Sequence, residues 1–293
     1  MRIKQTWFRR RTLASTAGVL PTRGGELEAI LVGSGGDIRL ARLFDGGSNA
    51  IVAAIDHGLY NGPRPGFEDL GAVIDRLLGA DAILLSPGMV PHLAGAFGHR
   101  GAPAMIVRLN WGTQYATQWG YHESRSVPMI SAAGAIALGA DIVLVGMSIK
   151  TGSEAVDAEN VEMVARCVTE ARAAGVPIVG EVYPAGHEDV TPEERHEVIS
   201  IGCRIVAELG VDLVKTFHTG DRFAEVCRST PVPVLALGAR KLPHEAERDG
   251  ARGVVFGRNL VGAKDPVRFM AALREVVKQG ADPAAAAAAH GLD

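Results

Sequence analysis

Short apolar, β-rich runs alternate with longer helix-like stretches from residue 50 to the end of the chain. Each run has the length of a buried strand, and apolar residues recur at helical spacing between the runs. This alternation predicts eight strands separated by helices. The predicted strands are Ala50–Asp56, Ala82–Ser86, Ala104–Leu109, Asp141–Met147, Pro177–Tyr183, Leu213–Phe217, Val232–Leu237 and Gly253–Phe256.

The ends of the predicted helices favour a parallel, closed sheet. Several helical stretches, Pro192–Leu209 among them, end in Gly-Ala-Asp or Gly-Val-Asp directly before a strand. Glycine that closes a helix before a buried strand is typical of the loops in α/β proteins. Eight such units predict an α/β TIM (β/α)8 barrel over residues 39–293, with an N-terminal extension over residues 1–38. A doubly wound open sheet is the alternative.

Composition narrows the class of protein. The chain has 293 residues, of which 47% are hydrophobic and 22% charged, enough for one large core. Its net charge of -3 argues against nucleic-acid binding, and the absence of a long apolar run argues against a membrane protein. Three widely spaced cysteines fit neither a disulfide framework nor a zinc motif. An arginine run at residues 9–11 precedes an apolar segment, but polar residues interrupt that segment, so we expect a cytoplasmic protein with a basic arm.

Lys215 is the candidate nucleophile. It lies within an apolar strand, residues 213–217, where a charged side chain is costly unless it is paired or used. A nucleophilic lysine needs surroundings that favour its neutral amine, and the interior of a barrel can provide them. Lys150 and Lys241 lack such surroundings, because one lies at a strand rim and the other in a loop.

The alternation of side chains along a strand selects the polar residues that face the barrel interior. By this alternation Lys215, Glu181, Tyr183 and Asp56 all point inward near the carboxyl ends of their strands. Barrel enzymes place their chemistry at these ends. We therefore expect the four side chains to converge on one site.

Two loops have the composition of anion-binding sites. Gly238 and Ala239 follow the seventh predicted strand, with Arg240 next, and Gly257 and Arg258 follow the eighth. Barrels bind phosphate in the loops after these strands, between backbone N–H groups and a helix terminus. We expect a small phosphorylated ligand there.

These motifs together resemble the class I aldolases of the archaeal fructose-bisphosphate aldolase type (the DhnA family), which also contains LsrF-like thiolases. The resemblance covers residues 39 to 277. It rests on Asp56-His57-Gly58 with Gly62-Pro63, Tyr183-Pro184, Val214-Lys215-Thr216 with Thr219-Gly220, and the run from Gly253 to Asn259. The chain departs from the family at Ala185, where an arginine is common, and at Arg108–Thr113.

The resemblance implies a Schiff-base aldolase that makes or breaks a carbon–carbon bond in a small phosphorylated ketose or related keto compound. It implies that Lys215 forms the Schiff base, that Tyr183 donates the proton and that Asp56 assists. His57 and Glu181 are further candidate substrate contacts. No metal and no cofactor are implied, and a homo-oligomer is expected.

Three alternatives remain. An LsrF-like thiolase would use the same lysine on a phosphorylated diketone with coenzyme A. A metal-dependent aldolase could use His57, Glu181 and His218, but no tight pair of histidines is present and both histidines are predicted to face outward. The third is a phosphate-binding barrel without catalysis, which the joint presence of Lys215, Tyr183 and Asp56 disfavours.

A separate prediction concerns the C-terminal part of the sequence and the strands that it covers. Residues 244–249 leave room for only about two helical turns between strands seven and eight, too short to cover the neighbouring strands. A helix over Asp265–Gln279 and a short alanine-rich helix from Pro283 to His290 are predicted beyond. We expect this tail, or an adjoining subunit, to fill the gap.

Overall fold

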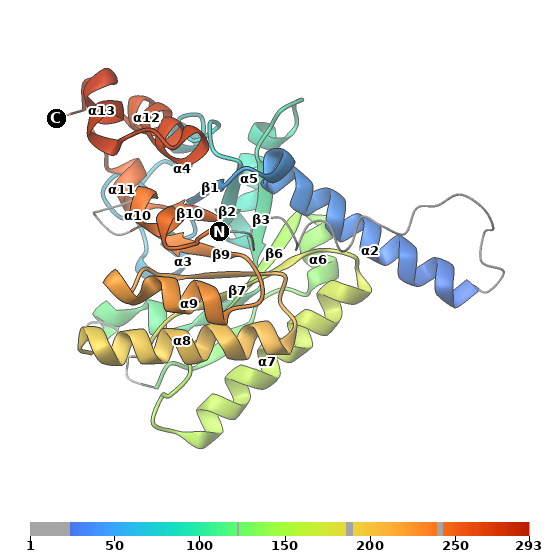
Figure 1. The fold of residues 1–293 in the computed structure, drawn as a ribbon. Coiled ribbons are helices and arrows are strands. Elements are labelled where there is room, and N and C mark those ends of the chain that lie inside the picture. Colours follow the sequence, from blue (N-terminus) through green and yellow to red (C-terminus); the bar gives the residue numbers. More distant parts are fainter. Residues whose placement is uncertain (1–23, 122, 186–189, 239–242, 293) are drawn as a thin grey trace.

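The computed structural model describes residues 24–121, 123–185, 190–238 and 243–292, and its strands close into a barrel (Figure 1). All eight barrel strands are parallel, and β10 pairs with β1 to close the sheet. The strands are β1 (Ala50–Ala54), β2 (Ala82–Leu85), β3 (Ala104–Arg108), β6 (Ile142–Met147), β7 (Ile178–Val182), β8 (Leu213–Phe217), β9 (Val234–Leu237) and β10 (Gly253–Phe256). The predicted fold class is confirmed, and so is each predicted strand.

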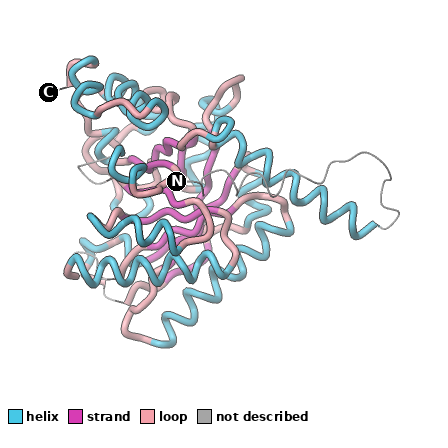
Figure 2. The backbone as a smooth tube through the Cα atoms, in the orientation of Figure 1, coloured by secondary structure: helices cyan, strands magenta, loops and turns pink. Residues whose placement is uncertain are grey.

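Helices lie around the outside of the strands (Figure 2). They are α2 (Gly24–Leu43), α3 (Gly58–Asn61), α4 (Leu70–Ile74), α5 (Val90–Leu93), α6 (Ala132–Ala137), α7 (Glu154–Ala173), α8 (Pro192–Leu209), α9 (Phe223–Ser229), α10 (Pro243–Arg248), α11 (Arg258–Val261), α12 (Pro266–Gln279) and α13 (Pro283–Ala289). Helix α8 shows why the boundaries could be predicted. Thr191 and Glu194 form a capping box at its start, and Gly210, with φ of 100°, ends it in the left-handed conformation.

The Gly-x-Asp motifs before the strands have a structural use. In each, the aspartate carboxylate accepts a hydrogen bond from a backbone N–H of an adjacent strand. The pairs are Asp81 with Ile51 (2.7 Å), Asp141 with Met105 (3.0 Å) and Asp212 with Ile178 (3.0 Å). These carboxylates satisfy N–H groups at the amino end of the barrel, opposite the end where a site is expected.

Apolar side chains fill the barrel and a second set covers its outer surface. The inner set includes Val52, Leu84, Ile106, Leu144, Val179, Leu213, Leu235 and Val255. The residues between them along each strand point outward against the helices. Leu43, the last residue of α2, and Phe44, which follows it, are buried with the inner set, so the end of this helix contributes to the core of the barrel.

Helix α2 continues across the expected boundary between residues 38 and 39, and its amino-terminal part extends away from the barrel (Figure 1). Near its carboxyl end, Arg42 pairs with Asp141 at 2.6 Å and Arg39 donates to the carbonyl of Gly175. The division at residue 38 stays a prediction. None of the described helices has both the length and the apolar character needed to cross a membrane.

Both predicted C-terminal helices are present. Helix α13 packs on α12, where Ala286 is buried with Ala272 and Val276. Helix α10, between the last two strands, has six residues and also contacts α12. The expected homo-oligomer stays a prediction.

Candidate active site

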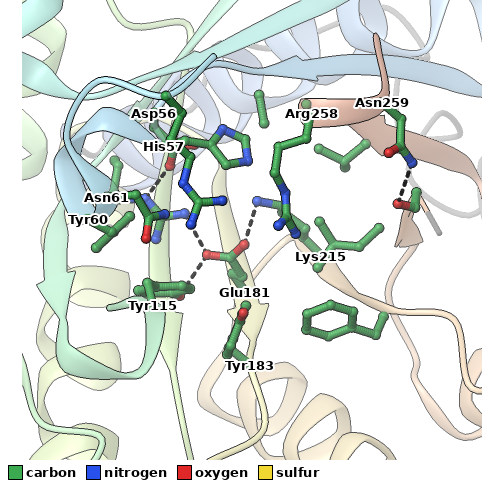
Figure 3. A pocket seen from close by; sticks show the side chains of 18 residues that line it. Asp56, His57, Tyr60, Asn61, Tyr115, Glu181, Tyr183, Lys215, Arg258 and Asn259 are labelled. Carbon is green, nitrogen blue, oxygen red and sulfur yellow. Dashed lines mark hydrogen bonds and ion pairs between the residues drawn. The ribbon is translucent and has the colours of Figure 1, made fainter. Parts of the chain in front are cut away.

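A layer of charge lies directly above the apolar filling of the barrel. Arg108, Glu181 and Lys215 each follow an inward apolar residue by two positions, and Asp56 follows inward-facing Ala54 in the same way. Each of the four residues is at most 4% exposed. They line one cavity of about 190 Å³ at the carboxyl ends of the strands (Figure 3). The structure therefore brings Asp56, Glu181 and Lys215 together, with an arginine between the carboxylates.

Arg108 links the two carboxylates across the barrel. Its Nε donates to Oδ2 of Asp56 and its Nη2 donates to Oε2 of Glu181, both at 2.6 Å. The remaining nitrogen, Nη1, is buried and has no hydrogen-bond partner among the described residues. Arg108 also lines the cavity.

Lys215 forms an ion pair with Glu181, between Nζ and Oε1. The pair follows from strand register, because the two residues lie opposite each other on β7 and β8. Two cations, Arg108 and Lys215, balance two carboxylates, Asp56 and Glu181. Ionised side chains at this depth are tolerated only when paired in this way.

The cations keep both carboxylates ionised. Burial alone would raise the pKa of Glu181, but Arg108 and Lys215 outweigh it and bring that pKa to about 2. Burial likewise opposes ionisation of Asp56, and Arg108 and Lys215 again bring its pKa below the ordinary value. Both groups are therefore hydrogen-bond acceptors at neutral pH and not proton donors.

Arg108 and Tyr115 were not among the predicted site residues. Arg108 could have been found, because the alternation that selected Lys215 also places it inward two positions after Ile106. Tyr115 carries no such signal, because it belongs to the loop after β3 that contains the hairpin β4 (Asn110–Gly112) and β5 (Ser126–Pro128). Its hydroxyl donates to Oε2 of Glu181 at 2.7 Å.

Gly146 on β6 makes room for this contact. A Cβ atom at Gly146 would lie 2.0 Å from the Tyr115 hydroxyl, so no side chain is compatible with the present position of Tyr115. The Asn110 amide binds both backbone groups of Gly146 at 2.8 Å. Burial, followed by the nearby Glu181 charge, raises the pKa of Tyr115 well above its ordinary value. Tyr115 is therefore a hydrogen-bond donor that holds Glu181 and a poor acid.

Tyr183 lines the same cavity, as predicted from its position after β7. Its ring packs edge-on against Tyr115, with 4.7 Å between centroids, and against Phe217 at 5.0 Å. Unlike Tyr115, it is only partly buried. Its position beside Glu181 (Figure 3) places it in the same cavity as Lys215.

The outward position predicted for His57 is wrong. His57 lines the cavity, because β1 ends at Ala54 and the alternation does not continue through the following turn. Its ring packs on Phe67 with 5.2 Å between centroids. Burial, the largest influence, lowers the pKa of His57 below the ordinary value, so its imidazole is neutral at pH 7.

Gly238, Gly257 and Arg258 also line the cavity, and Ala239 lies outside the described residues. The backbone N–H of Gly238 donates to the carbonyl of Val255, so it is not available to an anion, contrary to the expectation for this loop. Packing explains why glycine occupies both positions. A Cβ at Gly238 would lie 2.6 Å from the ring of Phe256, and one at Gly257 would lie 2.8 Å from a backbone oxygen.

The other sequence candidates lie outside this cavity. His218 lies beside Asp249, at 3.2 Å, and Lys150 pairs with Glu197 at 2.8 Å on the surface. Within the described residues, no group of three or more His, Cys, Asp or Glu side chains is placed to hold a metal ion.

Comparisons with known proteins agree with this geometry. Residues 50–262 match the profile of the DeoC/LacD family aldolases. An uncharacterized aldolase of Saccharolobus solfataricus is 30% identical over 265 residues, covering 85% of this chain and 96% of that protein. A 3-hydroxy-5-phosphonooxypentane-2,4-dione thiolase of Yersinia pestis is 26% identical, covering 85% and 84%.

One solved structure is informative about chemistry. It is an archaeal fructose-1,6-bisphosphate aldolase in which the catalytic lysine is covalently bound to the carbinolamine intermediate of the substrate. Its sequence is 26% identical, the match covers 82% of this chain and 98% of that protein, and the TM-score is 0.67.

Proposed function

This chain is a Schiff-base (class I) aldolase of the DeoC/LacD family, and on that premise we propose that Lys215 is the lysine that forms its Schiff base. The observation that carries this proposal is the ion pair of buried Lys215 with Glu181 on the floor of the cavity. Among the described lysines it alone lines the cavity.

The reaction begins when the Lys215 amine, having lost its proton, attacks the carbonyl carbon of a ketone. The carbonyl oxygen takes up a proton to give a carbinolamine, and loss of water leaves an iminium ion. In the cleavage direction, a base in the site takes the proton of the hydroxyl two carbons away, the carbon–carbon bond breaks, and an aldehyde leaves as the iminium becomes an enamine. Protonation of the enamine carbon and hydrolysis of the resulting iminium then release the ketone and return the Lys215 amine.

Glu181 is suited to two tasks. Its Oε1 contacts Nζ, so it is placed to accept the ammonium proton as the nucleophile forms and to pass it on to the carbonyl oxygen, which leaves Glu181 ionised again. It also neutralises the iminium, which carries the same charge as the ammonium, so the site of two cations and two carboxylates stays balanced in both states. Arg108 and Tyr115 fix the carboxylate in place.

The proposed role of Asp56 is to orient the substrate and not to donate a proton. Because it is ionised and bound to Arg108 at 2.6 Å, it can accept a hydrogen bond from the carbinolamine hydroxyl but has no proton to give. Tyr183 is then the proposed proton carrier, since Tyr115 is held by Glu181 and is a poor acid.

Replacing Tyr183 tests this division of roles. Tyr183→Phe removes the hydroxyl and keeps the ring, so turnover should fall by at least about 10²-fold, the size of a lost acid–base group. Tyr115→Phe is the matched control and should still turn over faster than Tyr183→Phe. Steady-state turnover rates of the two variants measure the difference. A larger loss of turnover in Tyr115→Phe than in Tyr183→Phe would assign the proton transfer to Tyr115 instead.

The substrate is proposed to be a small phosphorylated keto compound. The thiolase and the solved aldolase are both named for phosphorylated compounds. In this chain Arg258 lines the cavity at the start of α11. Arg258 is therefore the proposed contact for the phosphate of the ketone donor.

Removing this charge should weaken donor binding. Arg258→Met should raise KM for dihydroxyacetone phosphate about 10-fold or more, the worth of one charge-assisted contact. For dihydroxyacetone, which lacks the phosphate, KM should change little. Equal changes for the two ketones would mean that Arg258 does not bind the phosphate. A separate assay with a phosphorylated diketone and coenzyme A, followed by detection of an acyl-coenzyme A, distinguishes the thiolase outcome from aldol cleavage.

A further inference from the structure

The backbone of Tyr183, the proposed proton carrier, lies just beyond the last residue pair of β6 and β7. The register of these strands ends with Met147 opposite Val182. The N–H of Tyr183 still donates to the carbonyl of Met147 at 3.0 Å, but the next residue, Pro184, has no N–H with which to continue the ladder. The pairing of the strands therefore does not by itself fix the position of Tyr183.

Ser148 supplies a further bond at this point. It directly follows β6, is fully buried, and donates from Oγ to the carbonyl of Tyr183 at 2.6 Å. Two consecutive residues, Met147 and Ser148, thus hold both backbone groups of Tyr183. A short bond between a hydroxyl and a carbonyl, away from water, is well suited to fix a backbone position.

Asn160 on α7 holds Ser148 in turn. It is 1% exposed, and its amide nitrogen donates to the carbonyls of Ser148 and Ser124, both at 3.0 Å. Ser124 belongs to the loop after β3, which also carries Tyr115, and its φ of 52° is one that a serine keeps only when its surroundings hold it there. One amide therefore joins the loop of Tyr115 to the residue that holds Tyr183.

The ring of Tyr183 is fixed by packing, as its backbone is by these bonds. It lies edge-on to the rings of Tyr115 and Phe217, with 4.7 and 5.0 Å between centroids. Because the ring is rigid, a shift of the backbone is carried through to the hydroxyl at its far end. A group that transfers a proton must lie within about 3 Å of the atom it serves, and a misplacement of about 1 Å can cost about 10²-fold in rate.

We infer that Ser148, held by Asn160, is a positioning residue for the reaction. Through its hydrogen bond to the backbone of Tyr183, it sets the distance from the tyrosine hydroxyl to the substrate carbon next to the Schiff base at Lys215. The inference rests on the proposed function, in which Tyr183 carries the proton. It adds two residues that act through Tyr183, since neither Ser148 nor Asn160 lines the cavity.

Hydrogen exchange measures the step in question. When dihydroxyacetone phosphate forms its iminium on Lys215, the carbon next to the iminium loses a proton, and the resulting enamine takes up another that comes from solvent. In heavy water that carbon therefore gains deuterium, which ¹H NMR follows. Ser148→Ala should slow this exchange about 10-fold or more, while borohydride should trap as much of the ketone on Lys215 as in the unmodified protein.

A double variant separates positioning from a general loss of structure. Added to Tyr183→Phe, in which the hydroxyl is already absent, Ser148→Ala should cause no further loss of exchange. Thr230→Val is the matched control and should leave exchange unchanged, because the buried Thr230 hydroxyl donates to the carbonyl of Val226 at 2.8 Å outside the cavity. If Ser148→Ala slows exchange by the same factor with and without the Tyr183 hydroxyl, the inference is wrong.

A crystal structure of Ser148→Ala tests the positioning whatever the role of Tyr183. The Tyr183 hydroxyl should be displaced relative to Nζ of Lys215, and an unmoved hydroxyl would overturn the inference. Exchange at the unmodified rate in Ser148→Ala would also overturn it, provided that Tyr183→Phe slows exchange. Unchanged exchange in Tyr183→Phe, together with a displaced hydroxyl in Ser148→Ala, would instead count against the proposed function alone.

Discussion

Sodium borohydride added together with dihydroxyacetone phosphate should inactivate the enzyme and leave the reduced adduct on Lys215. Reduction of an iminium fixes the substrate to the amine that formed it, so the modified peptide identifies the nucleophile. Lys215 is the expected position because it is 4% exposed, lines the cavity and contacts Glu181. Peptide mass spectrometry after digestion gives the result.

Substitution gives the corresponding loss of activity. Lys215→Met should reduce kcat on the order of 10⁴-fold or more, because the covalent route disappears with the amine. Lys150→Met is the matched control, since Lys150 lies on the surface paired with Glu197 and should keep full activity. An adduct on Lys150, or activity retained in Lys215→Met, would rule out the proposed nucleophile.

Arg108→Met should lower the free energy of unfolding by about 3–5 kcal/mol, the cost of removing one partner from a buried ion pair. The reason is that Asp56 and Glu181 would stay buried with Lys215 as their only cation within the charged layer. Unfolding in urea measures the change. Activity should fall as well, because Glu181 would lose one of the groups that fix it.

An exposed arginine gives the comparison. Arg125 forms ion pairs with Glu123 at 2.7 Å and Glu159 at 3.2 Å, but all three side chains are at least half exposed. Arg125→Met should therefore change the free energy of unfolding far less than Arg108→Met does. If Arg125→Met and Arg108→Met lower the free energy of unfolding by similar amounts, burial does not determine how much the Arg108 contacts contribute to stability.

Local patterns were sufficient for most of the fold. The strands could be predicted because each is a short apolar run, and the limits of α8 because Thr191, Pro192 and Gly210 act on the backbone within a few residues. The inward positions of Lys215 and Glu181 follow from a period of two along a single strand. These effects need no knowledge of distant parts of the chain.

The same local rule failed at His57. Alternation holds only while the backbone is extended, and the chain turns after Ala54 into α3. The N–H of Gly238 is a second case. It was expected to bind an anion, but the neighbouring strand β10 places the carbonyl of Val255 where it accepts this hydrogen bond.

By itself, then, the sequence determined the barrel, the lysine within an apolar strand and the carboxylates on the inner face. Only the tertiary structure decided which side chains meet. Arg108 reaches Asp56, 52 positions earlier, and Glu181, 73 positions later, while Tyr115 reaches Glu181 from a hairpin loop over the space left by Gly146. The physical reason is that alternation fixes the face of a strand on which a side chain lies, whereas contacts across the interior depend on how the strands tilt and close.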